Sequence, residues 1–278
     1  MHACFKDASA YERIVDAFLV DCRRQNMRYV EAHFTPYNHD RLASLSGEEA
    51  LAIVSHRLRE AEAAGGPVVR LILDIPSEAL PESGEYTASL LERIADPVVI
   101  AIGLGGPEVG FPRSAAAPFF ARARRAGYPA VAHAGETHVA EHVLQAVHDL
   151  KVQRVQHGVQ AVEDADVLAL LAERQICCDV TPVSNTFLTP YRDLAAHPIR
   201  RMIEAGVPVT LGTDDPAFFG VDLTTEYVRA HREIGLSLDE LWQLNLNGLR
   251  YGLADVSVRR RLLREFAAEG EALGIAGA

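Results

Sequence analysis

The sequence predicts an α/β fold, a TIM-type (β/α)8 barrel in which parallel strands alternate with helices. Seven short runs rich in Val and Ile are separated by amphipathic stretches, which is the order of βα units around a parallel sheet. The runs are nearly continuous in hydrophobicity, as in strands that are covered on both faces. They occupy residues 29–34, 68–75, 98–104, 130–134, 154–157, 177–181 and 207–212.

The stretches between these runs are predicted to be helices because their apolar residues recur at three- and four-residue spacing. Three of them end in the same way, with Gly65, Gly127 or Gly206 shortly before a Pro that begins the next strand. Gly closes a helix in the left-handed conformation, and Pro at the first strand position removes no ladder hydrogen bond. The predicted helices include residues 11–25, 139–150, 223–234, 237–249 and 256–268.

The length of the chain, 278 residues, suits one barrel of about 250 residues. No linker rich in Ser or Gly interrupts the repeat, so we expect a single barrel domain over residues 1–278. Seven strands are recognisable and the first strand of an eight-stranded barrel is missing. The barrel is therefore expected to be incomplete and truncated at its N-terminus, with additional C-terminal helices.

Composition excludes several classes of function. With 27 Lys+Arg against 38 Asp+Glu, the net charge is −11, which argues against nucleic acid as a partner. No apolar run approaches the ~20 residues of a membrane helix, and residues 1–4 do not begin a signal peptide. We therefore expect a cytoplasmic protein with no membrane partner, and leave its oligomeric state open. The cysteines Cys4, Cys22, Cys177 and Cys178 are expected to be buried thiols.

Polar residues follow four consecutive predicted strands, where the catalytic groups of parallel barrels lie. A His, a second His and two Asp at the ends of different strands are the composition of a mononuclear metal site that activates water. Each residue alone also has a structural explanation, such as a turn at the two Asp, but the combination indicates a site. The motifs are His133-Ala134-Gly135-Glu136, His157-Gly158, Thr181-Pro182-Val183-Ser184-Asn185 and Thr213-Asp214-Asp215-Pro216.

In these motifs the sequence resembles the adenosine deaminase family of the amidohydrolase superfamily. The resemblance covers nearly all of the chain and includes Tyr29-Val30-Glu31, Leu104-Gly105-Gly106-Pro107-Glu108 and His197-Pro198. It implies a zinc-dependent aminohydrolase that replaces the 6-amino group of an adenine-type purine by oxygen and releases ammonia. Adenosine is the main expected substrate, and adenine and aminodeoxyfutalosine stay open.

The resemblance implies roles for four residues in metal binding and catalysis. His133 and Asp214 would be ligands of one zinc ion, which would activate a water molecule. His157 would orient that water for attack on C6 of the purine. Glu136 would donate a proton to ring N1, where addition at C6 places electron density.

Three further residues would bind the substrate. Asp215 would hydrogen-bond purine N7, and Gly106 would offer its backbone N–H to N3 without a side chain to block close approach. Gly135 would line the same site. A small-molecule purine is thus the expected partner.

The family carries two more zinc ligands in a His-x-His pair at the end of its first strand, and this sequence contains no His-x-His. With His133 and Asp214 alone, a four-coordinate zinc site would be half complete, so weak zinc binding and little activity are expected. We favour the hypothesis that the chain is a fragment of an ordinary deaminase, because Glu136, His157 and Asp215 keep their reactive identities. The alternatives are a catalytically impaired barrel that binds purines or a partner, and an amidohydrolase that cleaves a different C–N bond.

Two secondary features have weaker implications. Ser184 and Asn185 are expected either to support the site through hydrogen bonds or to form a plain turn. His138 and His142 lie four residues apart on a predicted helix, and we expect them on its solvated face instead of on a metal.

Overall fold

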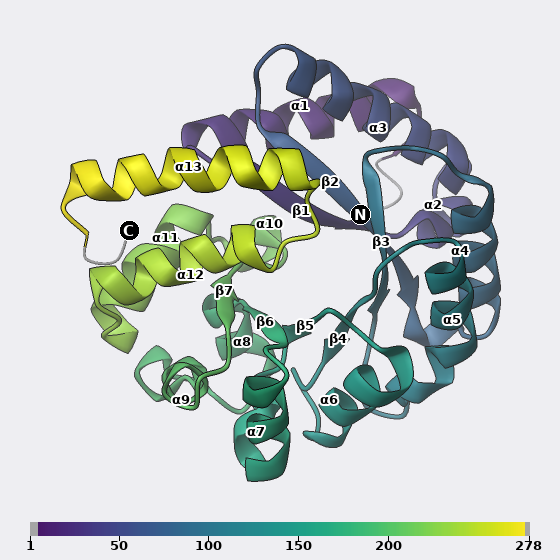
Figure 1. The fold of residues 1–278 in the computed structure, drawn as a ribbon. Coiled ribbons are helices and arrows are strands. Elements are labelled where there is room, and N and C mark those ends of the chain that lie inside the picture. Colours follow the sequence, from purple (N-terminus) through teal and green to yellow (C-terminus); the bar gives the residue numbers. More distant parts are fainter. Residues whose placement is uncertain (1–4, 276–278) are drawn as a thin grey trace. The chain divides into compact units, whose positions relative to one another are not determined.

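The computed structural model describes residues 5–275, so the expectations for His2 and Cys4 lie outside the described residues. Its contacts divide the chain into two compact units. The first comprises the residues up to Pro107 together with Ser114–Val131, and the second comprises Glu108–Arg113 and the residues from Ala132 onward. Figure 1 shows the order of the helices and strands along the chain.

The first unit is built on a three-stranded sheet in the order β1-β2-β3. The strands are β1 (Tyr29–Phe34), β2 (Val68–Pro76) and β3 (Val99–Gly105), and both pairs are parallel. Every residue of β2 is buried, as its continuous hydrophobicity predicts for a strand covered on both faces. The helices of this unit are α1 (Ala8–Arg24), α2 (Pro36–Leu42), α3 (Gly47–Ala63), α4 (Glu82–Arg93) and α5 (Ala117–Arg125).

The second unit contains a four-stranded sheet in the order β4-β5-β6-β7. The strands are β4 (Val131–Ala134), β5 (Arg154–His157), β6 (Cys177–Val180) and β7 (Val209–Leu211). The helices are α6 (Glu141–Gln145), α7 (Ala165–Glu173), α8 (Pro182–Leu188), α9 (Ile199–Glu204), α10 (Pro216–Phe219), α11 (Leu223–Arg229), α12 (Leu238–Arg250) and α13 (Val256–Leu273). Both sheets therefore place their strands in the order of the chain.

All seven predicted strands are present, which confirms the α/β class. The glycines Gly65, Gly127 and Gly206 have φ angles of 80°, 94° and 84°, the left-handed conformation expected at these helix ends. The strand predicted at 207–212 begins two residues before β7 does. The N–H of Val207 donates to the carbonyl of Met202 at 3.0 Å and thus closes α9.

Two predicted helices end in π-helical turns, at Ala146–Leu150 after α6 and at Ala230–Ile234 after α11.

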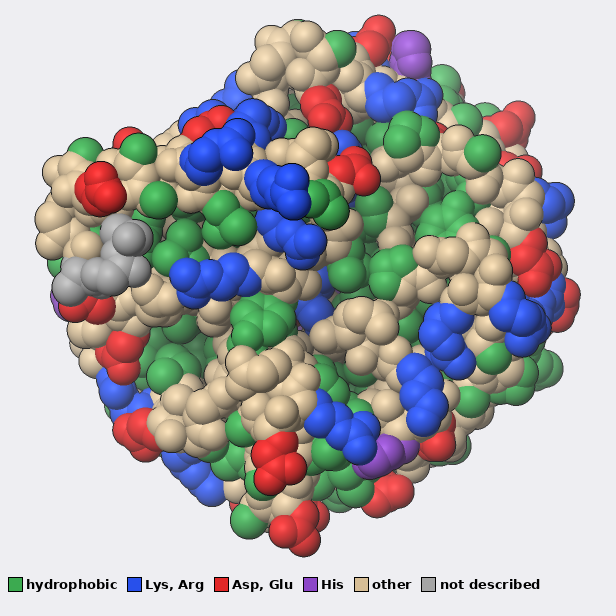
Figure 2. Space-filling view, viewed as in Figure 1, with side chains coloured by type: hydrophobic (Ala, Val, Ile, Leu, Met, Phe, Trp, Pro, Cys, Tyr) green, Lys and Arg blue, Asp and Glu red, His purple; other side chains and the backbone are tan. Residues whose placement is uncertain are grey.

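Among residues 5–275, no helix is both long and apolar enough to cross a membrane. Figure 2 shows acidic and basic side chains together on the face in view. The described cysteines, Cys22, Cys177 and Cys178, are free and buried, as expected.

Candidate active site

The end of β4 carries His133 and leads into Glu136 through a sharp bend at Gly135. Gly135 has a φ of 64°, and an added Cβ would lie 2.5 Å from Cγ2 of Val143. Only glycine fits this bend without strain. A residue with a side chain is disfavoured in the left-handed conformation, and its Cβ would clash with the neighbouring helix. Gly135 therefore shapes the segment that presents Glu136, in addition to the substrate contact expected from the resemblance.

The bend is held by the carboxylate of Glu108. Its two oxygens accept hydrogen bonds from the backbone N–H groups of Gly135 (2.6 Å), Glu136 (3.0 Å), Thr137 (2.6 Å) and His138 (3.0 Å). Glu108 is 2% exposed, so these donors have a fixed partner in a site that excludes water. Burial alone raises the pKa of Glu108, but the backbone donors, led by Thr137 and Gly135, outweigh burial and lower it.

His142 also lies beside this carboxylate. Its Nδ1 is 3.4 Å from Oε1 of Glu108, and the residue is buried. The expectation of a solvated His142 was therefore wrong, because a charged partner 34 positions earlier in the chain draws the imidazole inward. His138 is half-buried, and its ring packs edge-on against that of His142 at 5.1 Å between centroids.

Glu136 combines burial with a carboxyl oxygen that makes no hydrogen bond within residues 5–275. Its Oε1 is buried and has no hydrogen-bond partner among the described atoms. Burial raises the pKa of Glu136 to about 7, with smaller contributions in the same direction from Asp214, Glu108 and Asp215, while His133 opposes them. A carboxyl group that keeps its proton near neutral pH can serve as a general acid.

His157 ends β5 in an unusual backbone conformation, with a φ of 64°. Its Nδ1 lies 3.0 Å from Oγ1 of Thr181 and 3.3 Å from Nδ2 of Asn185. The structure thus favours the supporting role of Asn185 over a plain turn. Ser184 contributes indirectly, since its hydroxyl lies 2.8 Å from that of Thr181.

Asp214 follows β7 and also has a left-handed backbone, with a φ of 57°. A strained non-glycine residue persists only where its surroundings hold it, and such residues concentrate at functional sites. Ligand atoms of Glu136, His157 and Asp214 lie within 4.8 Å of one another. The neighbouring Asp215 is exposed and precedes α10, and its side chain makes no capping hydrogen bond there.

The second unit therefore brings together the residues predicted at the ends of β4, β5 and β7. The His133 ring lies 5.3 Å from that of His157, and His133 and Asp214 both act on the pKa of Glu136. Imidazole nitrogen and carboxylate oxygen are donors that zinc accepts, and the buried Oε1 of Glu136, without a hydrogen-bond partner among the described atoms, suits a polar group placed beside it. His133 and Asp214 thus carry donor atoms of the kinds that zinc binds, and their joint ligation of one ion stays a prediction.

Gly106 lies in the first unit, directly after β3. Its φ is 82°, and an added Cβ would lie 2.2 Å from Oε2 of Glu78 and 2.8 Å from Oγ of Ser77. A side chain is therefore excluded at this position both by the backbone and by its neighbours. The expected contact of its N–H with a purine stays a prediction.

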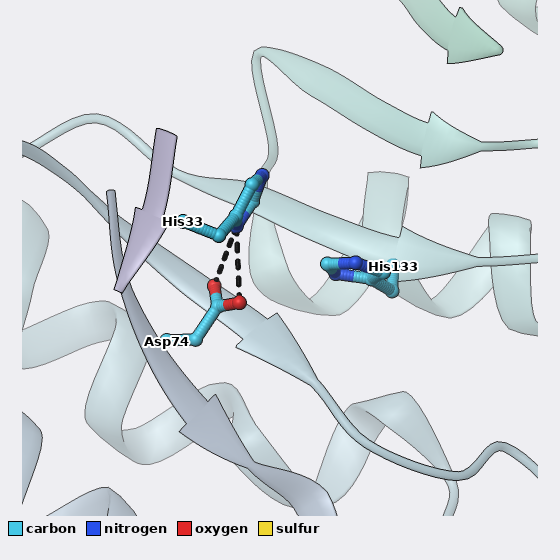
Figure 3. A group of neighbouring side chains, drawn as sticks. All are labelled: His33, Asp74 and His133. Carbon is cyan, nitrogen blue, oxygen red and sulfur yellow. Dashed lines mark hydrogen bonds and ion pairs between the residues drawn. The ribbon is translucent and has the colours of Figure 1, made fainter. Parts of the chain in front are cut away.

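Two polar residues in the first unit were missed from the sequence. Nδ1 of His33, near the end of β1, lies 2.9 and 3.0 Å from the two carboxyl oxygens of Asp74, near the end of β2 (Figure 3). An added Cβ at Gly103, which pairs with Asp74 across the sheet, would lie 1.8 Å from Oδ1 of Asp74. Polar residues near strand ends mark candidate sites in parallel barrels. Applied to the first two strands, this rule would have singled out His33 and Asp74.

Glu226 on α11 is a third residue that the sequence did not reveal. It is fully buried, and its oxygens lie 3.2 and 3.4 Å from the backbone N–H of Val183 near the start of α8. Burial raises the pKa of Glu226 to about 7, although the Val183 N–H and Arg229 oppose the change. The folded protein therefore holds this proton across a pH range in which an unfolded chain has released it.

We expect Glu226→Gln to remove a pH dependence of stability. The contribution of protonated Glu226 is complete below its ordinary pKa of 4.5 and is lost as pH rises through about 7. Gln cannot ionise and keeps an oxygen for Val183, so it should restore on the order of 3 kcal/mol at about pH 8. Denaturant titrations with a chelator at about pH 5 and about pH 8 measure this. The exposed control Glu173→Gln should leave the dependence unchanged, and an equal decline in wild type and Glu226→Gln would contradict it.

Comparison with known proteins identifies the family. The family model described as adenosine deaminase matches residues 1–269. The chain belongs to the adenosine deaminase family. This confirms the resemblance that the strand-end motifs indicate.

Curated relatives of the chain are named as two different deaminases. An aminodeoxyfutalosine deaminase from Streptomyces coelicolor is 41% identical over 247 residues, which are 88% of this chain and 64% of that protein. An adenine deaminase from Bordetella parapertussis is 35% identical over 243 residues, 86% of this chain and 74% of that protein. The chain thus spans less than two thirds of the length of the Streptomyces relative.

Solved structures of an adenine deaminase and an amidohydrolase share the fold. The adenine deaminase of Arthrobacter aurescens matches with a TM-score of 0.90 and 28% identity, over 96% of this chain and 81% of that one. An amidohydrolase from Burkholderia ambifaria, solved with bound Zn, matches with a TM-score of 0.91 and 27% identity over 97% and 75% of the two chains. The predicted relation to the adenosine deaminase type of barrel is confirmed by these matches.

Proposed function

We propose that this chain provides the catalytic residues of a zinc-dependent deaminase that removes the 6-amino group of an adenine-type purine. The observation that carries the proposal is the grouping of Glu136, His157 and Asp214, with a carboxyl group at Glu136 whose pKa burial raises to about 7. A general acid beside two metal-binding residue types suits hydrolytic deamination, which needs an activated water and a proton at ring N1.

The residues of the chain divide the reaction among them. Zinc, when bound by His133, Asp214 and further ligands, would lower the pKa of a water molecule. His157 orients the attacking oxygen toward C6, and the carboxyl group of Glu136 donates its proton to N1 as the C6–O bond forms. The 6-amino group takes up the proton that the attacking water gives up, so the C6–N bond breaks and ammonia leaves. The hydroxyl proton of the adduct returns to Glu136, and the 6-oxo purine keeps the proton on N1.

The remaining assignments concern the substrate. Asp215 hydrogen-bonds purine N7 from its exposed position after β7, Gly135 lines the site, and Gly106 donates its N–H to N3. Adenosine was the main expectation from the motifs, whereas the curated relatives described above deaminate aminodeoxyfutalosine and adenine. We therefore place aminodeoxyfutalosine and adenine beside adenosine as substrates to be tested.

The decisive experiment measures ammonia release with added Zn²⁺ from adenosine, adenine and aminodeoxyfutalosine, in parallel with calorimetric binding of each purine. Turnover of at least one of the three is expected, at the low level that a zinc site with only His133 and Asp214 of the family's ligands supports. Binding without ammonia release would overturn the enzyme proposal in favour of a purine-binding protein. Release of ammonia from a different C–N compound alone would place the chain with another amidohydrolase activity.

His133→Ala and Asp214→Ala should each lose zinc and turnover together, because each removes a first ligand atom. The loss of zinc affinity should exceed the roughly 100-fold effect found when only an outer partner of a ligand is removed. Zinc titration against a competing chelator measures the affinity. The matched control His231→Ala removes an imidazole on the π-helical turn Ala230–Ile234 and should change neither property. Full zinc affinity in His133→Ala would reject its assignment.

The buried, free state of Cys22, Cys177 and Cys178 suits a reducing compartment, so the proposal includes the cytoplasm as the place of action.

A further inference from the structure

A chain of hydrogen bonds runs from α9 to His157 through two buried side chains. The backbone N–H of Ile199 lies 3.2 Å from Nδ1 of His197, and Nε2 of His197 lies 3.2 Å from Oδ1 of Asn185. Nδ2 of Asn185 lies 3.3 Å from Nδ1 of His157. His197 is 3% exposed and Asn185 is fully buried, so water does not compete for these bonds.

The first bond determines which nitrogen of His197 carries the proton. A backbone N–H can only donate, so Nδ1 of His197 must accept from Ile199 and cannot itself be protonated. Burial lowers the pKa of His197 to about 3, so the ring is neutral. The single ring proton of His197 is therefore on Nε2, which donates to Asn185.

The orientation of the Asn185 amide follows from that donor. An N–H group on His197 requires the amide oxygen opposite it, which turns the NH2 group toward His157. The NH2 group can only donate, so Nδ1 of His157 must be the acceptor. The hydroxyl of Thr181, 3.0 Å from the same nitrogen, can rotate to donate or accept and does not decide the direction.

We propose that His197 is a positioning residue that sets the tautomer of His157 through Asn185, keeping Nδ1 of His157 as an acceptor and its proton on Nε2. The backbone N–H of Ile199 on α9 thus determines the donor and acceptor atoms of His197. These determine those of Asn185, and Asn185 determines those of His157. Oε1 of Glu136 lies 3.6 Å from Nδ1 of His157, which is longer than a hydrogen bond, so it does not compete with Asn185 for that nitrogen.

The tautomer of His157 matters for the deamination proposed above, and its catalytic consequence rests on that proposed function. With its proton on Nε2, His157 can donate one hydrogen bond to the attacking oxygen and hold it in place. An imidazole with the opposite tautomer would present a lone pair from Nε2 instead of a donor. Setting the tautomer in advance avoids the need to select it when the substrate binds.

The test is a long-range ¹H–¹⁵N spectrum of the ¹⁵N-labelled protein, with the His157 signals assigned by their loss in His157→Gln. Wild type should show an acceptor-type shift at Nδ1 of His157 and a donor-type shift at Nε2. A donor-type shift at Nδ1 in wild type overturns the proposal. We call the hydrogen-bonded series Ile199, His197, Asn185 and His157 the relay. This measurement requires neither a substitution in the relay nor enzymatic activity of the protein.

Substitutions in the relay reverse or preserve its direction. Asn185→Asp offers two acceptor oxygens, so Nδ1 of His157 should gain a proton and its shift should become donor-type. His197→Gln retains a donor for Asn185 and an acceptor for Ile199, so the His157 shifts should stay those of wild type. An unchanged His157 in a folded Asn185→Asp, or a changed tautomer in a folded His197→Gln, would contradict the relay.

The kinetic measurement separates this inference from the proposed function. Asn185→Asp should lower kcat by about 10- to 100-fold with little change in KM, while His197→Gln stays near wild type. If the wild-type spectrum shows the expected tautomer but no purine is deaminated, the proposed function fails and the relay stands. If deamination occurs and Nδ1 of His157 carries the proton, the relay fails and the proposed function stands.

Discussion

Glu136→Gln is expected to lower turnover by about 10²- to 10⁴-fold while the fold and the zinc affinity are retained. The amide of Gln has nearly the shape of the carboxyl group but cannot give up a proton to N1 of the purine. Steady-state ammonia release and zinc titration measure the two quantities. Glu141→Gln, an exposed change on α6, serves as the control and should leave both at the wild-type values.

The same substitution should not destabilise the protein. The pKa of Glu136 is raised to about 7 by burial, so the ionised form is disfavoured in the folded state and weakens it as pH rises through this value. Gln removes this cost, and at about pH 8 the variant should unfold at the same denaturant concentration as wild type or a higher one. Full activity in Glu136→Gln would reject the proton-donor role, and a large loss of stability would reject the account of its burial.

Glu108→Ala is expected to have the largest effect on stability, about 3 to 5 kcal/mol. It leaves the backbone N–H groups of residues 135–138 without the carboxylate that accepts from them. Turnover should fall as well, because the same bonds hold the segment that presents Glu136. Chemical denaturation and ammonia release check the two effects, and the exposed Glu173→Ala should change neither.

Glu108→Gln provides a second measure if Glu108→Ala does not fold. Gln keeps one acceptor oxygen but turns an NH2 group toward N–H donors, so an intermediate loss of stability is expected. The lowered pKa of Glu108 adds a pH dependence with a defined sign. Its ionised form stabilises the folded protein above the ordinary pKa of 4.5, and this stabilisation is lost as pH falls through the lower folded value. A wild-type stability that rises on acidification below about pH 4 would contradict this account.

Local patterns in the sequence predict much of this fold. The run at 29–34 coincides with β1 because Thr35 and Pro36 begin a helix immediately after it. The boundary at β7 was misplaced because Val207 is apolar like a strand residue, although its N–H is used by the preceding helix. Hydrophobicity reports burial, whereas the strand boundary depends on where the N–H donates.

The candidate site was predictable to the same extent. His157 ends a strand, and Glu136 and Asp214 lie two and three residues beyond strand ends, so parallel pairing brings them to one edge of the second sheet. Glu108 could be recognised only as part of a motif, since it lies 27 residues before Gly135 and no local spacing links them. The relay from His197 depends on the direction of an amide, which residue types alone do not reveal.

The strict chain order of the strands in both sheets bears on how the protein is made. Each strand pairs with a strand close to it in sequence, so no pairing has to wait for a distant segment. On the ribosome, all residues of the β1-β2-β3 sheet and its helices are present once Val131 has emerged. The three strands of the first unit can therefore pair with one another during synthesis, before β5, β6 and β7 exist.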